Sequence, residues 1–162
     1  MTTFDIRLAQ MSDAVRIAAI SRDHIEYGLG WRYQQAEIRQ KIGHPETNVI
    51  VALHDGKLAG FAIMEYAGFE AHLILFAVLP EYRRQRAGTA LLHWLIRTAE
   101  VSGAQTIFVE MRKANAAGRR FYESIGLKPM EQLHQYYRRN EDGMRMALDL
   151  RHPCEPGTDQ PS

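Results

Sequence analysis

Val78-Leu-Pro-Glu-Tyr-Arg-Arg-Gln-Arg-Ala-Gly-Thr-Ala-Leu-Leu92 is the stretch that decides the fold of this chain. The apolar run at residues 73–79 overlaps its beginning and predicts a buried strand. After the stretch, apolar residues recur at helical spacing: Ala87, Leu91, Leu92, Leu95, Ile96 and Ala99. The sequence therefore predicts a strand, a turn at Pro80 and the first turn of a helix.

The predicted turn is basic at Arg83, Arg84 and Arg86, and it is small at Gly88 and Ala90. The first backbone N–H groups of a helix have no partner within the helix, and the helix dipole adds partial positive charge there. Small residues let an anion approach that backbone closely. The turn therefore predicts a phosphate or pyrophosphate site; the alternative is a solvated basic turn before an ordinary helix.

Length and composition are those of a globular domain. The 162 residues are enough for one domain with a sizeable core, and we expect it to span 1–150, followed by a tail at 151–162. A formal net charge of +1 gives no reason to expect nucleic acid or a membrane as partner. The single cysteine, Cys154, excludes an internal disulfide. Without a signal-peptide pattern or a bilayer-length apolar run, a cytoplasmic protein is expected.

The remaining chain predicts an α/β fold. Phe4, Ile6 and Leu8 alternate with polar residues as in a half-buried strand, and Ser12 can cap a helix that continues to Ser21. Further strands are expected at 48–54, 58–66, 72–79, 106–111, 127–137 and 144–150, and further helices at 34–42, 88–101 and 115–125. Short turns, such as Asp55-Gly56, indicate an antiparallel meander, and the helix at 88–101 allows one parallel crossover. We expect a mixed, mostly antiparallel sheet of about seven strands, with helices on both faces.

Several motifs in this order resemble the GNAT acetyltransferases. Gln85-Arg86-Ala87-Gly88-Thr89-Ala90 fits the family signature Q/R-x-x-G-x-G/A. Glu110-Met-Arg112, Asn115-Ala-Ala117 and Tyr122-Glu-Ser-Ile-Gly-Leu127 are similar to a run in the RimI-type acetyltransferases of ribosomal-protein N-termini. The resemblance covers about residues 3–150. It implies the GNAT fold and an N-acetyltransferase that uses acetyl-CoA.

The resemblance also implies which residues bind the coenzyme. In the family, the basic turn binds the pyrophosphate, the backbone of the preceding strand pairs with the pantetheine arm, and an asparagine touches the coenzyme. The corresponding residues here are Phe76, Ala77, Val78, Arg83, Arg84, Gln85, Arg86, Ala87, Gly88, Thr89, Ala90 and Asn115. Asn115 can in addition cap the helix that follows it.

Glu110 is the candidate general base. Strand alternation separates it from the apolar face of Ile107, Val109 and Met111, and partial desolvation would raise the pKa of such a carboxyl. The alternative is a solvated edge glutamate, or one that is paired with a neighbouring arginine. The resemblance places a catalytic glutamate at this position. It also makes Tyr122 the acid that protonates the leaving thiol, whereas a purely structural interpretation makes Tyr122 helix core.

Acceptor recognition is expected at an aromatic loop and at the last hairpin. The candidate acceptor-binding residues are Tyr27, Trp31, Tyr33 and Tyr137. The acceptor is a protein or peptide N-terminus, or alternatively a small amine; a non-catalytic acyl-CoA-binding module is a third hypothesis. His72 is expected to be cross-strand or solvent-facing rather than catalytic, and the histidine spacing predicts no metal. Cys154 lies beside no recognisable base, which argues against an acyl-cysteine intermediate. The resemblance leaves homodimerisation open.

Overall fold

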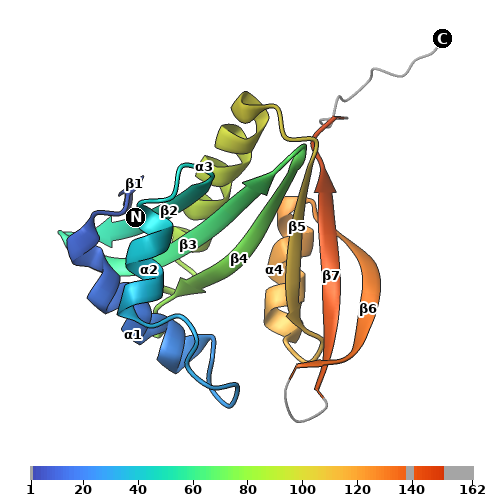
Figure 1. The fold of residues 1–162 in the computed structure, drawn as a ribbon, viewed down its shortest axis with the longest axis horizontal. Helices are drawn as coiled ribbons and strands as arrows, with labels where there is room; N and C mark the ends of the chain where they lie inside the picture. Colours follow the sequence, from blue (N-terminus) through green and yellow to red (C-terminus); the bar gives the residue numbers. More distant parts are fainter. Residues whose placement is uncertain (1, 138–140, 152–162) are drawn as a thin grey trace.

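The fold is a seven-stranded sheet with helices on both faces (Figure 1). The computed structural model describes residues 2–137 and 141–151. The strands are β1 (Asp5–Leu8), β2 (Thr47–His54), β3 (Lys57–Ala67), β4 (Glu70–Val78), β5 (Thr106–Arg112), β6 (Lys128–Tyr137) and β7 (Glu141–Asp149). The helices are α1 (Ala14–His24), α2 (Gln35–Ile42), α3 (Ala87–Ser102) and α4 (Ala116–Ile125), with short 3₁₀ turns η1 (Met11–Asp13) and η2 (Pro80–Tyr82).

The strand order is β1-β2-β3-β4-β5-β7-β6, and every neighbouring pair is antiparallel except β4 and β5. The α3 helix makes the crossover that a parallel pair requires. The predicted mixed sheet is therefore confirmed, including the tight turn at Asp55 and Gly56, where both residues have positive φ.

The parallel pair β4–β5 is short. Only Glu70–Leu73 pair with Thr106–Val109, and beyond these residues the two strands diverge (Figure 1). Within the described residues, no strand pairs with β4 on this side after Leu73. The sheet is therefore open between the end of β4 and the end of β5.

A β-bulge in the middle of β4 changes which side chains face which layer. Met64 pairs with Leu73 but Ile63 pairs with Leu75, so Ile74 is the extra residue. Leu73 consequently packs in the core that α3 covers, whereas Leu75 packs in the core beneath α1 and α2. The bulge directs Phe76 toward the α3–α4 side, at the opening between the strands.

Each face of the sheet has its own core. Ile17, Ile20 and Ile38 of α1 and α2 pack on one face, and Leu91, Leu92 and Leu95 of α3 pack on the other. Central strands that are buried on both faces explain the nearly continuous apolar runs in the sequence.

Three local predictions near the termini need correction. Ser12 does not begin α1, because the Asp13 carboxylate accepts from the Gln10 backbone N–H at 2.7 Å and organises η1 instead. Leu8 is 56% exposed, since β1 is an edge strand and its last residue projects past the core. The last strand begins at Glu141, where the sequence had predicted a turn up to Gly143. Of the predicted tail at 151–162, only Arg151 is among the described residues, so Cys154 lies outside them.

Candidate active site

The turn between β4 and α3 presents backbone N–H groups at the sheet opening. Arg84 and Arg86 both have left-handed backbone angles, with φ of 63° and 73°. No side chain in the described part of the chain caps the start of α3, where Arg86 is the N-cap residue. Alternating backbone handedness and uncapped N–H groups are features that can bind an anion. The turn therefore has the backbone geometry on which the predicted phosphate site depends.

The side chains of this turn have different environments. The Arg83 guanidinium donates from Nε to the Val78 carbonyl at 3.1 Å, and Gln85 donates from Nε2 to the Glu81 carbonyl at 2.9 Å. These two side chains therefore stabilise the turn itself. Arg84 and Arg86 are exposed and available to a ligand, whereas Ala87 is buried in the core.

Gly88 lies beneath a pair of stacked aromatic rings. The rings of Phe76 and Phe121 are 5.5 Å apart at an interplanar angle of 9°. A Cβ atom on Gly88 would lie 3.1 Å from the Phe76 ring and 3.3 Å from the Phe121 ring. The approach of β4 and α4 to the start of α3 therefore favours glycine here, because any side chain would require these rings to shift.

The α4 helix carries two of the predicted residues. Asn115 caps it, since its side-chain oxygen accepts from the Gly118 backbone N–H at 3.0 Å. Tyr122 is buried, and it packs beside Phe76 and Phe121 in the core that also contains Val109. Tyr122 thus lies on the α3–α4 side of the sheet, next to the opening.

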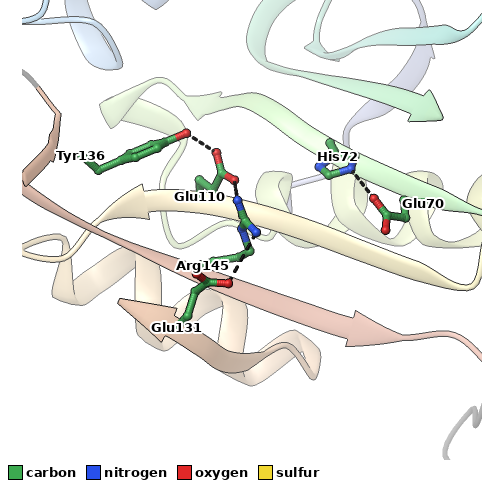
Figure 2. A network of polar contacts seen from close by, with 6 residues as sticks. All are labelled: Glu70, His72, Glu110, Glu131, Tyr136 and Arg145. Carbon is green, nitrogen blue, oxygen red and sulfur yellow. Dashed lines mark hydrogen bonds and ion pairs between the residues drawn. The ribbon is translucent and has the colours of Figure 1, made fainter. Parts of the chain in front are cut away.

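Glu110 projects from the opposite face of β5 and is held by side chains of β7, the adjacent strand, and of β6, the strand beyond it (Figure 2). The Tyr136 hydroxyl donates to Oε1 at 2.6 Å. Arg145 donates to Oε2 from Nε at 3.0 Å and from Nη2 at 2.5 Å. The structure therefore shows the arrangement that the sequence analysis gave as an alternative, in which Glu110 is paired with a neighbouring arginine.

The expected rise of the Glu110 pKa is wrong. Burial does act to raise the pKa, but the hydrogen bonds from Tyr136 and Arg145 and the charge of Arg145 outweigh it. The pKa of Glu110 is therefore lowered from its ordinary value. The same hydrogen bond raises the pKa of Tyr136.

His72 lies near this carboxylate without contacting it. Its ring stacks on Phe108 across β4 and β5 with 5.2 Å between centroids, and its Nε2 lies 3.1 Å from Glu70 (Figure 2). The prediction of a cross-strand histidine is confirmed.

A buried carboxylate organises the aromatic loop between α1 and α2. Glu26 is 7% exposed; Oε1 accepts from the Arg32 N–H at 2.6 Å and the Tyr33 N–H at 3.2 Å, and Oε2 accepts from the Ser21 hydroxyl at 2.7 Å. Trp31 is anchored to the helix, since its Nε1 donates to the Ala18 carbonyl at 3.2 Å. These contacts stabilise the conformation of the loop.

Arg112 connects the aromatic loop to the end of β5. Its Nη2 donates to the backbone carbonyls of Tyr27 at 2.8 Å and Ile25 at 3.2 Å, and its guanidinium lies 4.3 Å from the centre of the Tyr27 ring. The loop is thus attached to the strand that carries Glu110. Tyr27 and Tyr33 lie on this side of the sheet, whereas the side chain of Tyr137 lies outside the described residues.

Sequence reasoning missed Glu26, Arg112 and Arg145. Arg145 faces Glu110 in the strand register, which only the pairing of β5 with β7 reveals. Glu26 offered one signal, because it is a single acid between two apolar residues in a loop with glycines.

In the part of the chain that the structure describes, no group of three or more His, Cys, Asp or Glu side chains is arranged to hold a metal ion. None of the helices in that part of the chain is long and apolar enough to cross a membrane.

Comparison with known proteins places this geometry in context. The model of the acetyltransferase (GNAT) family matches residues 16–127. The ribosomal protein bS18-alanine N-acetyltransferase of Escherichia coli strain K12 is 40% identical over 99 residues, which are 59% of this chain and 67% of that protein. The N-alpha-acetyltransferase of Sulfurisphaera tokodaii is 29% identical over 160 residues, which are 91% of this chain and 93% of that protein.

Solved structures agree over nearly the whole chain. The ribosomal-protein-S18-alanine N-acetyltransferase from Escherichia coli aligns with a TM-score of 0.77 and 27% identity, covering 99% of this chain and all of that one. Arabidopsis thaliana NAA60 in complex with acetyl-CoA aligns with a TM-score of 0.82 over 92% of this chain and 99% of that one. Its identity of 16% makes this a likeness of fold.

Proposed function

Because the chain belongs to the GNAT acetyltransferase family and is an N-acetyltransferase, we propose that it moves the acetyl group of acetyl-CoA to the α-amine of a protein or peptide N-terminus. One observation carries the proposal: the two candidate proton-handling side chains, Glu110 and Tyr122, flank the β4–β5 opening from opposite faces of the sheet. The acceptor amine would approach from the Glu110 face. The coenzyme thiol would leave on the Tyr122 face.

The coenzyme side of this proposal rests on the basic turn. The uncapped N–H groups at the start of α3 and the exposed Arg84 and Arg86 would hold the pyrophosphate. The strand edge of β4 beyond Leu73, which has no strand partner in the described part of the chain, would pair with the amide groups of the pantetheine arm. Phe76, Ala77 and Val78 form this edge, and Asn115 lies at the start of α4.

The acceptor side is supported by the electrostatics of Glu110. Its pKa is lowered, so it is an ionised but weak base at neutral pH. A protein α-amine has a pKa of about 7.7–8.0 and is partly neutral already, whereas a lysine-type amine of about 10.4 is almost fully protonated. A weak carboxylate base therefore suits an α-amine. The relatives from Escherichia coli and Sulfurisphaera tokodaii, a ribosomal protein bS18-alanine N-acetyltransferase and an N-alpha-acetyltransferase, support the same acceptor class.

The proposed reaction is direct attack in a complex of both substrates. The neutral amine nitrogen forms a bond with the thioester carbonyl carbon, and its excess proton moves to Glu110. The carbon–sulfur bond then breaks, and the thiolate takes the proton of the Tyr122 hydroxyl. Solvent removes the proton from Glu110 and returns one to Tyr122, so that both side chains regain their starting states.

The test is thiol release from acetyl-CoA across a panel of acceptors. The panel contains peptides with free N-termini, the same peptides with blocked N-termini and an internal lysine, and small amines such as amino acids and polyamines. Turnover with free N-termini alone supports the proposal. Turnover confined to small amines would replace it, and binding of acetyl-CoA without turnover of any acceptor would indicate a non-catalytic module.

A further inference from the structure

Three charged residues form a single row across the sheet beside the proposed catalytic centre. Glu110 of β5 pairs in register with Arg145 of β7, and Arg145 pairs in register with Glu131 of β6. All three side chains lie on one face, and the arginine lies between the two acids (Figure 2). The backbone hydrogen bonds between the three strands set the order of these residues. The position of Arg145 therefore depends on strand pairing as well as on its own side-chain contacts.

The arginine contacts its two acids differently. Its Nε and Nη2 both donate to Oε2 of Glu110, at 3.0 and 2.5 Å, while its Nη1 lies 3.5 Å from Oε1 of Glu131. The side chains of Glu110 and Arg145 are 28% and 32% exposed, so this pair is partly shielded from water. Two N–H groups on one oxygen restrain the orientation of the whole carboxylate.

The other oxygen of Glu110 faces a different neighbour. Among the residues that the structure describes, Oε1 accepts one hydrogen bond, from the hydroxyl of Tyr136, which is 49% exposed. Besides this hydrogen bond, the nearby Tyr33 of the aromatic loop contributes to the raised pKa of Tyr136. A carboxylate oxygen with one donor retains capacity for a proton, whereas Oε2 is occupied by the guanidinium. Oε1 is therefore the oxygen on the side from which an acceptor would approach.

We propose, building on the function proposed above, that Arg145 is a positioning residue for the acetyl transfer, which holds Oε2 of Glu110 so that Oε1 receives the proton of the attacking amine. The guanidinium has two separable effects. Its positive charge keeps the carboxylate ionised, and its fixed, planar pair of N–H groups sets the direction of Oε1. Glu131 restrains the guanidinium from the far side.

The charged and titratable groups around Glu110 come from three strands. Arg145 on β7 and Tyr136 on β6 contact it, and His72 on β4 favours its ionised form from a greater distance. Two further acids contact these neighbours of Glu110: Glu131 on β6 contacts Arg145, and Glu70 on β4 contacts His72. Among these groups Arg145 donates the most hydrogen bonds to Glu110, so its removal has the clearest expected effect.

Arg145→Gln and Arg145→Lys separate the two effects. In Arg145→Gln, burial of Glu110 is no longer offset by the guanidinium, so the acidic limb of the pH–rate profile moves to higher pH. At pH values above that limb kcat stays at least about 10-fold below wild type, because the direction of Oε1 is lost. Arg145→Lys restores the positive charge but not the planar pair of N–H groups. The acidic limb of the pH–rate profile should therefore return toward its wild-type position while kcat remains reduced.

Carbon-13 NMR titration of the Glu110 carboxyl provides a readout that needs no acceptor, with Glu110→Gln used to assign the signal. The expected order of the Glu110 pKa is Arg145→Gln highest, then Arg145→Lys, then wild type. Arg151→Gln is the matched control, since it removes an arginine that pairs with Asp149 at the far end of β7 and should change neither readout.

The inference is overturned if Arg145→Gln keeps both the wild-type kcat and the wild-type titration of Glu110. If Arg145→Gln does not fold, the same result in Arg145→Lys overturns it. Full recovery of kcat in Arg145→Lys would contradict the orienting role. An absence of turnover in the wild-type enzyme with every acceptor would instead count against the proposed function, while the NMR titration still tests the effect of Arg145 on Glu110.

Discussion

The rings of Phe76 and Phe121 stack 5.5 Å apart directly over Gly88, and they join β4 and α4 to the first turn of α3. The stack lies on the α3–α4 side of the sheet, beside the turn that we propose binds the coenzyme pyrophosphate. A side chain at Gly88 would have to displace one of the rings or occupy the space of the ligand.

Gly88→Val and Gly88→Glu should therefore weaken acetyl-CoA binding by at least about 10-fold, or about 1.4 kcal/mol. Both variants add bulk at the start of α3, and glutamate adds a negative charge at the anion site. Calorimetric titration with acetyl-CoA measures the effect. Thr98→Ala, a change further along α3, is the control and should bind normally. Unchanged affinity in both Gly88 variants would exclude this turn as the coenzyme site.

The aromatic loop should determine acceptor binding through Glu26. Glu26→Gln keeps the size of the side chain but weakens its hydrogen bonds to the N–H groups of Arg32 and Tyr33. We expect the acceptor KM to rise several-fold, with coenzyme affinity nearly unchanged. Steady-state kinetics at saturating acetyl-CoA give the first quantity and calorimetry the second.

Glu37→Gln on the exposed surface of α2 is the matched control for the Glu26 variant. Equal effects of Glu26→Gln on acceptor KM and coenzyme affinity would indicate general loss of structure. An unchanged acceptor KM in a folded variant would remove the loop from the acceptor site.

Tyr66 offers a prediction about stability alone. In the part of the chain that the structure describes, its buried hydroxyl has no hydrogen-bond partner, and burial raises its pKa to about 12. Tyr66→Phe should leave the free energy of unfolding at pH 7 unchanged or higher by up to about 1 kcal/mol. Because the unfolded tyrosine ionises near pH 10, wild-type stability should fall between pH 10 and 12 and the variant should lose less. Urea unfolding at pH 7 and pH 10.5 measures both.

The ion pair of Glu110 should make stability depend on pH in the acidic range. The folded-state pKa of Glu110 is lowered, so its contribution is present above the unfolded pKa and is lost as pH falls through the folded one. Glu110→Gln should therefore be less stable than wild type at pH 7, and the difference should shrink as pH falls below about 4. Thermal melts at both pH values measure it, and a difference independent of pH would contradict the ion pair.

Much of the fold could be predicted because local signals agreed with the tertiary arrangement. Gly126 ends α4 in a left-handed conformation, Asn115 begins it, and the apolar runs match the strands. The start of α1 could not be predicted, because Ser12 is a good local cap, whereas in the structure Asp13 accepts from the Gln10 backbone N–H and pairs with Arg7. The extra residue Ile74 in β4 also gave no periodic signal.

The candidate residues that lie in a sequence motif could be predicted. The contacts that depend on how paired strands align could not. Glu110 and Tyr122 could be selected from the sequence, but the environment of Glu110 could not. Its pKa direction depends on Arg145 and Tyr136, which come from two later strands whose alignment is set by sheet pairing. Desolvation alone, which was the effect expected from the sequence, would raise the pKa of Glu110 instead of lowering it.

The central claim is that Glu110 and Tyr122 handle protons at opposite ends of one transfer, and the pH–rate profiles of Glu110→Gln and Tyr122→Phe test it most directly. Glu110→Gln should lower kcat roughly 10²–10⁴-fold near neutral pH, with partial recovery as pH rises and more acceptor amine becomes neutral. Tyr122→Phe should lower kcat without that recovery, and both variants should bind acetyl-CoA normally. A Glu110→Gln variant with wild-type kcat and an unchanged profile would contradict the account.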